Sequence, residues 1–333
     1  MRNGTNVTVL GSGSFGTALA TVLLNNGHNV MLWSFSQEEV DYMQKNKKNA
    51  LLPHVELSEK LHITSDRAVA TKDAEIIVFV TPTKFARVTL EGFKGLLKED
   101  ALIINASKGL EEGTLERLSE VISEIYPQNT VAVISGPSHA EELVEGMPTM
   151  LTAAATDIEV AKIVQDLFMN EKLRIYTNTD IVGVELGGAL KNIIALATGI
   201  SDGVGYGDNT KAALMTRGLS EISRLGIAMG ARQETFSGLS GVGDLIVTCT
   251  SMLSRNRRCG ILLGQGKSVE TAVSEIGMVV EGLNTVKAAY QMALKYNIDM
   301  PIVNKIHSVI SGERTPKDAM HDLMTRERKE ELS

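Results

Sequence analysis

The chain has 333 residues, of which 43% are hydrophobic, 22% charged and 4% aromatic, as in a folded protein of about two domains with a largely aliphatic core. Its net charge of −7 argues against a general nucleic-acid-binding protein. The spacing of Cys249 and Cys259 fits neither a metal site nor a disulfide framework, and no stretch approaches 18 consecutive apolar residues, so we predict a cytoplasmic protein with no metal and no membrane span.

Short apolar runs rich in β-branched residues alternate with helical patterns in the first half of the chain. Such runs are typical of parallel strands covered on both faces, and the alternation predicts an α/β fold with a doubly wound, Rossmann-like parallel sheet. We expect strands at 6–10, 29–33, 76–80, 101–106, 131–135, 149–155 and 173–177, and helices at 15–26, 84–97, 114–125 and 157–168.

The strand patterns end near residue 180, and helical patterns follow at 180–205, 209–230, 268–277 and 280–298. This change predicts a dinucleotide-binding domain over 1–185 and an all-α substrate-binding domain over 186–333. Because no linker separates the two halves, we expect them to pack closely, with an active site in the cleft between them.

A G-x-G-x-x-G motif lies between the first predicted strand and the first predicted helix. Gly11 allows a tight turn, Gly13 lets a pyrophosphate approach the backbone, and Gly16 lets the helix pack against the strand. The helix N-terminus offers free N–H groups to the phosphates. A glycine-rich turn without a ligand is the alternative, but the strand–helix–strand context favours dinucleotide binding.

The second predicted strand is followed by Ser34, Phe35 and Ser36, where NAD-binding proteins of this kind carry an acid that binds the ribose. Nothing at these three positions repels the 2′-phosphate of NADPH, and no arginine is there to bind it. The sequence therefore indicates a relaxed choice between NADH and NADPH without deciding it.

Lys191 is a candidate proton donor for a reaction at a carbonyl group. In the segment "VELGGALKNIIALATGI" the only other charge is Glu185, and burial would lower the lysine pKa toward the range useful for acid–base catalysis. A lysine that extends to solvent from an interdomain helix is an equally good interpretation. The small residues Gly187, Gly188 and Ala189 favour close approach of this helix to another part of the protein.

Two loops follow neighbouring predicted strands at the carboxyl edge of the sheet, where ligands of such folds bind. Lys108 lies in the first loop, and the segment "SGPSHAEE" in the second carries Gly136, Ser138 and the titratable His139. The alternative is that Lys108 is an exposed loop lysine and that the Gly-Pro segment is a turn capping a helix, with no ligand at either.

Asp244 lies in the glycine-rich, apolar segment "SGVGDLIVTC". An isolated acid in this setting is either a helix N-cap, which is the commoner case, or the partner of a functional lysine.

Three arginines are concentrated in "TSMLSRNRRCG". Ser254, Arg255 and Asn256 open a predicted short helix, and a hydroxyl, a guanidinium and a helix N-terminus together suit a phosphate group. For Arg257 and Arg258 we expect a solvated turn or indirect support of that site. A nucleic-acid site is disfavoured, because the cluster is short and lacks interleaved aromatic residues.

These segments together resemble the bacterial-type NAD(P)-dependent glycerol-3-phosphate dehydrogenases over nearly the whole chain. The resemblance rests on "GSGSFGTALA", "NASKGLE", "SGPSHAEE", "ELGGALKNIIALATGISDGVGYGDNTKAALMTRGL", "GVGDLIVTC", "SRNR" and "MVVEG", in that order. It implies reversible reduction of dihydroxyacetone phosphate to sn-glycerol 3-phosphate, which supplies glycerophospholipid synthesis.

The resemblance also implies roles for particular residues, with Lys191 as the proton donor. The residues that it places against the phosphorylated substrate are Lys108, Gly136, Ser138, Lys191, Asp244, Ser254, Arg255 and Asn256. Those that it places against NADH or NADPH are the motif glycines with Ser14, Phe15, Phe35, Lys108, Ala140, Arg255, Val279 and Glu281. Members of the family often carry a basic residue or histidine just after the second strand, where this chain has Ser34 and Phe35.

Two other functions remain open at this point. One is another two-domain dehydrogenase, acting on a hydroxy acid or a sugar phosphate. The other is a non-catalytic dinucleotide sensor, which would not need an isolated lysine beside a phosphate pocket. The oligomeric state is undetermined by the sequence, with a homodimer as one option, and no residue indicates feedback inhibition.

Overall fold

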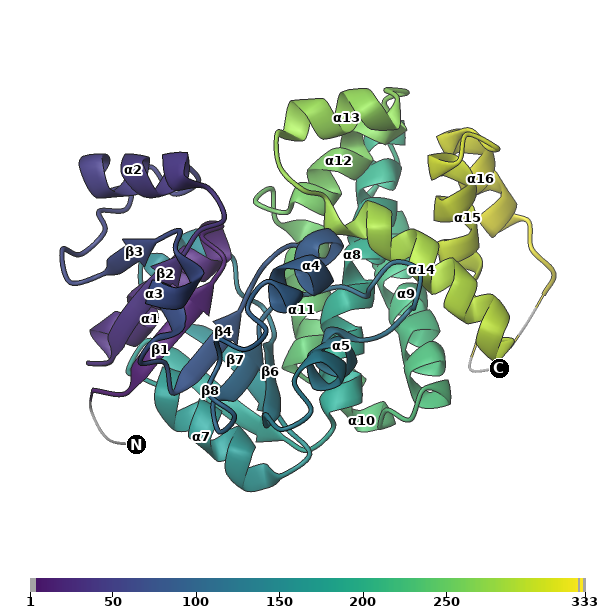
Figure 1. The fold of residues 1–333 in the computed structure, drawn as a ribbon. Helices are drawn as coiled ribbons and strands as arrows, with labels where there is room; N and C mark the ends of the chain where they lie inside the picture. Colours follow the sequence, from purple (N-terminus) through teal and green to yellow (C-terminus); the bar gives the residue numbers. More distant parts are fainter. Residues whose placement is uncertain (1–3, 329, 332–333) are drawn as a thin grey trace.

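The computed structural model describes residues 4–328 and 330–331. Within these residues, eight strands form one sheet in the order β3-β2-β1-β4-β5-β6-β7-β8 (Figure 1). The strands are β1 (Asn6–Leu10), β2 (Asn29–Trp33), β3 (His62–Thr64), β4 (Ile76–Phe79), β5 (Leu102–Asn105), β6 (Val131–Ser135), β7 (Thr149–Ala154) and β8 (Leu173–Asn178).

The sheet is parallel, as predicted for a doubly wound fold, except at one position, where β7 runs antiparallel to β6; β8 runs parallel to β7. The connection from β6 to β7 carries only the five-residue helix α6 (Ala140–Val144). Without a full crossover helix, the chain turns back at the sheet edge where β6 ended. Strand β3 was not predicted, because its three residues are only partly buried and give no apolar run.

Helices cover both faces of the sheet, as predicted for a doubly wound fold. Along β4, Ile76 and Val78 face one helical layer and Ile77 and Phe79 face the other, because successive strand residues point to opposite faces. The first layer contains α1 (Ser14–Asn25), α6 and α7 (Ile158–Phe168), and the second contains α3 (Arg67–Thr71), α4 (Ala86–Glu91) and α5 (Leu118–Ile125). Helix α2 (Gln37–Asn46) follows β2.

Two predicted helices are shorter than expected. A helix was predicted over 84–97. This segment contains a 3₁₀ turn followed by α4, and α4 ends at Glu91. Helix α5 begins at Leu118 rather than near residue 114.

The second half of the chain is helical, as predicted (Figure 1). It contains α8 (Ile181–Val204), α9 (Asp208–Ala228), α10 (Gln233–Phe236), a π-helical turn (Leu239–Gly243), α11 (Asp244–Thr250), α12 (Arg255–Gly264), α13 (Val269–Ile276), α14 (Glu281–Tyr296), α15 (Pro301–Ile310) and α16 (Pro316–Met324).

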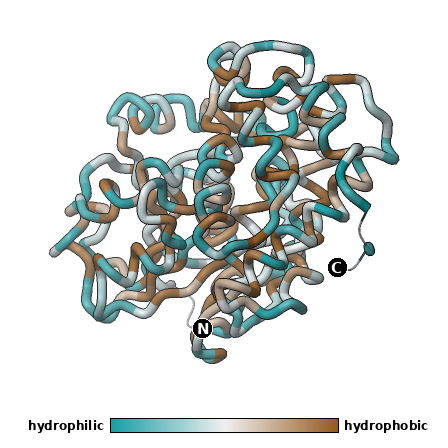
Figure 2. The backbone as a smooth tube through the Cα atoms, turned by 90° about the vertical axis from the view of Figure 1, so that its right-hand side faces the viewer, coloured by the Kyte–Doolittle hydropathy of each residue, from teal (hydrophilic) through white to brown (hydrophobic). Residues whose placement is uncertain are grey.

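Helix α8 joins the two halves and is the central helix of the second. Near its start Val184 packs against Val133 and Ala154 of the sheet, so the division predicted after residue 185 lies inside this helix. It is long and apolar enough to cross a membrane, yet 89% of its most apolar window is buried within the protein. Its apolar character is therefore that of a core helix, and Figure 2 shows hydrophilic turns mainly at the outline of the molecule.

Helix α12 packs directly on the backbone of α8. A side chain on Gly199 would overlap the Arg257 carbonyl, and one on Gly260 would overlap the Leu196 carbonyl. Only glycine permits this approach, and the contact fixes the start of α12 close to the middle of α8.

Candidate active site

Two lysines from different halves of the chain meet on one carboxylate. Lys191 of α8 donates to Asp244 Oδ1 and to Thr248 Oγ1, the latter at 2.6 Å, and Lys108 Nζ donates to Asp244 Oδ2 at 2.7 Å. The Lys191 and Asp244 side chains are only 8% and 1% exposed. The interpretation of Lys191 as a lysine that reaches solvent is therefore wrong.

Burial dominates the electrostatics of Lys191. It lowers the pKa of this lysine to about 8, assisted by the like charge of Lys108 and opposed by the carboxylate of Asp244. An amine with such a pKa can both donate and accept a proton near neutral pH.

Asp244 is the first residue of α11, and Gly243 occupies the N-cap position. Of the two roles open for this acid, the structure selects the lysine partner. Thr248 follows one turn later on the same helix and donates its hydroxyl proton to the Asp244 carbonyl at 2.6 Å. Sequence reasoning missed Thr248, although the i, i+4 spacing from Asp244 could have indicated it.

Small residues on α8 allow it to approach β6 and the π-helical turn closely, as the clustering of Gly187, Gly188 and Ala189 predicted. A side chain on Gly187 would lie 2.5 Å from the Ser240 carbonyl oxygen, and one on Gly188 would overlap the Ser135 hydroxyl. These contacts hold the Lys191 turn between the end of β6 and the π-helical turn before α11.

The loops after β5 and β6 meet at Lys108, as expected for two neighbouring strands of one sheet. Its ammonium donates to the Gly136 carbonyl at 2.7 Å and contacts the Ser138 hydroxyl at 3.3 Å. It also lies 5.8 Å from the centre of the Phe15 ring. Gly136 has φ +134°, a conformation that side chains disfavour. The substrate role of these residues stays a prediction.

His139 adjoins the lysines from the start of α6. Its pKa is lowered by burial and by the positive charges of Lys191 and Lys108. Among the described residues, its buried Nε2 has no hydrogen-bond partner. A neutral imidazole here provides a hydrogen-bonding group without adding a third positive charge.

All three residues of the predicted phosphate site make hydrogen bonds at the start of α12: Ser254 caps the helix itself, while Arg255 and Asn256 bond to neighbouring segments. Ser254 Oγ accepts from the Arg257 N–H at 3.2 Å, and Arg255 Nη1 donates to the Val279 carbonyl at 3.1 Å. Asn256 donates to Asn192 Oδ1 and accepts from the Gly282 N–H, both at 2.8 Å. Asn256 thus links this turn to the residue that follows Lys191.

Of the two alternatives for Arg257 and Arg258, a solvated turn is wrong for Arg257. Arg257 pairs with Asp202 at 2.7 Å and donates to the Thr250 carbonyl at 2.8 Å. Its side chain is 12% exposed, because α12 packs closely on α8. Arg258 is half-buried, and its Nε lacks a hydrogen-bond partner among the described residues.

Glu185, which precedes Lys191 on α8, belongs to a separate buried network. It accepts from Arg117 Nη1 at 2.7 Å and from Asn105 Nδ2 at 3.0 Å. Burial raises its pKa against the opposing effect of Arg117. This pair links α8 to the start of α5, a long-range contact that sequence reasoning did not find.

The glycine loop has the geometry that a pyrophosphate requires. Gly11 has φ +126°, and a side chain there would lie 2.6 Å from the Val80 carbonyl oxygen. A side chain on Gly16 would overlap the Gly11 carbonyl, whereas one on Gly13 would meet no atom within 4 Å. Helix α1 begins at Ser14 with no side-chain cap and no acid in its first turn, which leaves its N–H groups open to an anion.

The other predicted dinucleotide residues come from separate elements of the fold. Ala140 opens α6 beside His139, and Phe35 is 81% exposed after β2. Glu281, at the start of α14, accepts from the Thr83 N–H at 3.1 Å, and burial raises its pKa. This bond connects the helical half to the loop after β4.

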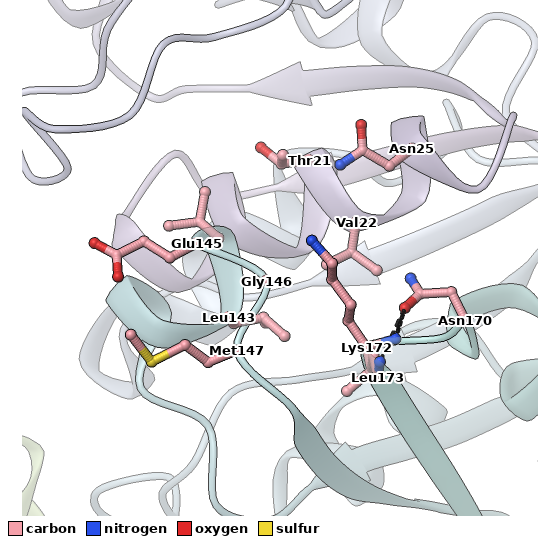
Figure 3. A pocket seen from close by; sticks show the side chains of 11 residues that line it. Thr21, Val22, Asn25, Leu143, Glu145, Gly146, Met147, Asn170, Lys172 and Leu173 are labelled. Carbon is pink, nitrogen blue, oxygen red and sulfur yellow. Dashed lines mark hydrogen bonds between the residues drawn. The ribbon is translucent and has the colours of Figure 1, made fainter.

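A hollow of about 100 Å³ lies elsewhere, beside the C-terminal half of α1 (Figure 3). Its lining includes Thr21, Asn25, Glu145 and Lys172, and it contains none of the predicted site residues.

Comparison with known proteins agrees with this geometry. Residues 6–161 match the family model of the N-terminus of NAD-dependent glycerol-3-phosphate dehydrogenase, and residues 180–321 match that of its C-terminus. The chain belongs to the NAD-dependent glycerol-3-phosphate dehydrogenase family. The resemblance drawn from its motifs is thereby confirmed.

The similarity to other members of the family covers nearly the whole chain. It is 50% identical to a glycerol-3-phosphate dehydrogenase [NAD(P)+] of Thermoanaerobacter sp. and 52% identical to one of Lysinibacillus sphaericus, covering 98% of both chains in each case. The crystal structure of glycerol-3-phosphate dehydrogenase from Coxiella burnetii has 38% identity and a TM-score of 0.94, covering 98% of this chain and 100% of that one. The predicted fold class and the assignment to NAD(P)-dependent oxidoreductases are confirmed.

Proposed function

We propose that this protein catalyses the reversible NAD(P)H-dependent reduction of dihydroxyacetone phosphate to sn-glycerol 3-phosphate. The observation that carries the proposal is the buried Lys191–Asp244–Lys108 cluster between the glycine loop and α12. Membership of the family and the names of its whole-length relatives support the same substrate.

The glycine loop and the first turn of α1 fit the pyrophosphate of NAD(H) or NADP(H), since Gly13 opens onto free space and the N–H groups have no side-chain acceptor. Ser14 and Phe15 in that turn, with Glu281 across from it, are the residues that would hold the cofactor. When bound, the nicotinamide supplies a hydride to the ketone carbon or accepts one from the alcohol.

Lys191 performs the proton transfer that accompanies the hydride. Its ammonium protonates the oxygen of the ketone during reduction, and the neutral amine accepts that proton during oxidation. The pKa of about 8 suits both directions. Asp244 and Thr248 hold the amine in position, because a positioned acid is far more effective than one free to rotate.

The phosphate of the substrate is placed at the start of α12. Ser254 Oγ accepts a backbone N–H, which leaves its own proton free to donate to a phosphate oxygen. Arg255 supplies charge from a largely buried position, where burial lowers its pKa and Glu281 opposes that change. Lys108, Gly136 and Ser138 would contact the rest of the substrate. Binding energy from the phosphate then positions the reacting carbon.

We assign the protein to the cytoplasm and its product to glycerophospholipid synthesis. We also propose a homodimer, which a measurement of the molecular mass in solution tests. These assignments rest on the sequence and on the family.

A steady-state assay of the purified protein with dihydroxyacetone phosphate, run in parallel with NADH and NADPH, tests the proposed function. We expect turnover with the phosphorylated ketone and at least about a hundredfold lower kcat/KM with dihydroxyacetone, because the phosphate contacts are then lost. Turnover of a different hydroxy acid or sugar phosphate would replace the substrate. Cofactor binding without turnover of any of them would indicate a dinucleotide sensor.

A further inference from the structure

The glycine loop is contacted by an acid that sequence reasoning did not place there. Glu39 lies in the first turn of α2, and its Oε2 is 2.8 Å from Ser12 Oγ and 2.6 Å from Ser34 Oγ. The two serine hydroxyls are themselves 2.8 Å apart. Ser12 lies between Gly11 and Gly13, and Ser34 directly follows β2, so this carboxylate lies where the ends of β1 and β2 meet.

The local sequence predicts a different position for this carboxylate. Ser36 and Glu39 have the S-x-x-E spacing of a capping box, in which the acid accepts from the backbone N–H of the serine. Here the Ser36 hydroxyl does accept from the Glu39 N–H at 3.3 Å, but the Ser36 N–H donates to Ser34 Oγ at 3.2 Å. The carboxylate of Glu39 is thus turned away from its own helix, toward the glycine loop.

One oxygen of this carboxylate remains available. Among the described residues, all hydrogen bonds of the Glu39 side chain are made through Oε2, and none reaches Oε1. The residue is exposed, so a ligand can reach that oxygen. The backbone of Ser12 is held in place as well, because the buried side chain of Asn49 donates to the Ser12 carbonyl at 2.7 Å.

In proteins of this fold, the adenosine ribose lies between the first glycine turn and the end of the second strand, where an acid binds its hydroxyls. We propose that Glu39 supplies this acid from α2, binds the ribose 2′-hydroxyl of NADH and disfavours the 2′-phosphate of NADPH. This proposal rests on the proposed function and adds a cofactor preference to it. It also adds to the sequence interpretation, which found no acid at positions 34–36.

The nearest competing feature is Arg67, a cation that could favour a 2′-phosphate. Its guanidinium lies 5.9 Å from the Trp33 ring centre and 5.8 Å from that of Phe93. Both rings lie in the hydrophobic core cluster that packs the sheet against α3 and α4. Ser34 contacts Glu39, whereas the ring of the preceding Trp33 contacts Arg67. It faces a hollow of about 520 Å³ that Phe35 also lines.

Direct binding without a ketone substrate tests the proposal. Dissociation constants for NADH and NADPH are measured by titration calorimetry on the wild-type protein, Glu39→Gln and Glu39→Ala. Glu38→Gln is the matched control, since it removes the same charge from the same turn of α2. We expect the wild type and Glu38→Gln to bind NADH at least about tenfold more tightly than NADPH, and both Glu39 variants to reduce that ratio by about tenfold.

The results separate this proposal from the proposed function. Equal affinities in the wild type, a preference for NADPH, or an unchanged ratio in both Glu39 variants would each overturn the role of Glu39. A Glu39-dependent preference for NADH in a protein that does not reduce dihydroxyacetone phosphate would uphold it and reject the proposed substrate. Circular dichroism of each variant confirms that α2 and the sheet are folded.

Discussion

The Lys191 ammonium donates a hydrogen bond to the Asp244 carboxylate inside the protein, with both side chains almost closed to water. Removing a charged amine from water is costly unless it is paired. Here one carboxylate serves two ammonium groups, since Lys108 occupies its other oxygen. The cluster carries one uncompensated positive charge. This charge adds to the larger effect of burial in lowering the pKa of Lys191 against its acidic partner, and it suits an anionic substrate.

Replacement of Lys191 by methionine is expected to reduce kcat for dihydroxyacetone phosphate by about 10²–10⁴, the usual contribution of a positioned general acid. The dissociation constant of the reduced cofactor should change less than about threefold, since Lys191 lies on α8 and not in the glycine loop. Lys162→Met, at a lysine whose side chain is 52% exposed, is the control. Wild-type turnover in Lys191→Met would remove the catalytic assignment.

The pH dependence of the reaction should follow the Lys191 amine. Reduction needs the ammonium and should decline as the pH rises through about 8, while oxidation needs the neutral amine and should increase over the same range. In Asp244→Asn the charge that raises this pKa is lost, so both transitions should move to lower pH. Rate profiles in both directions measure the shift, and Asp208→Asn, at a 99% exposed carboxylate, should not move them. Transitions that stay in place in Asp244→Asn would assign the titration to another group.

Arg255→Ala is expected to raise the KM for dihydroxyacetone phosphate by about tenfold to a hundredfold, as for loss of a charge-assisted hydrogen bond. The rate with unphosphorylated dihydroxyacetone should change little, because that substrate has no group for the guanidinium. The comparison of the two substrates in one variant separates a phosphate contact from damage to the fold. An equal loss with both substrates would instead place Arg255 in the support of α12, through its bond to Val279.

The sequence predicted those features that depend on neighbouring residues. The glycine motif, most buried strands and the start of α12 near Ser254 could be found because each has a local pattern. The reversal at β7 could not, since the residues of β7 are as apolar as those of a parallel strand and direction is set by the short connection from β6. Strand β3 was missed for lack of such a pattern.

Features that join distant segments were beyond local reasoning. Asp244 could be read as a cap or as a lysine partner until α8 and α11 were seen side by side. The segment around Arg257 has the composition of a solvated turn. Arg257 nevertheless pairs with Asp202, because the glycines of α8 and α12 bring the two helices together. The acid near the cofactor loop was sought at the end of β2, while Glu39 reaches it from the next helix.

The glycine contact between α8 and α12 should be intolerant of added volume. Gly260→Ala would place a methyl group on the Leu196 carbonyl, and we expect the free energy of unfolding to fall by about 3 kcal/mol, at the upper end for overpacking. Gly207→Ala is the control, since a side chain there meets no atom within 4 Å, and it should cost under about 1 kcal/mol. Urea unfolding measures both, and equal stability of the two variants would show that α12 can move away from α8 at little cost.

Glu221 makes the stability of the helical half depend on pH. Its carboxylate accepts from the Ile302 and Val303 N–H groups at the start of α15, yet burial raises its pKa to about 7. The folded protein therefore binds this proton more tightly than the unfolded chain, whose carboxyl has a pKa near 4.5. The resulting stability is fully present below pH 4.5 and is lost as the pH rises through about 7.

Between pH 5 and 8 the wild type should thus lose about 2–3 kcal/mol of unfolding free energy that Glu221→Gln, whose amide does not titrate, retains. Urea unfolding at a series of pH values gives the difference between the two proteins, in which the shared contribution of other groups cancels. Glu234→Gln, in the first turn of α10, serves as the control for removal of a carboxylate. A difference between wild type and Glu221→Gln that stays constant over this range would mean that Glu221 remains charged when buried, held by the two N–H groups alone.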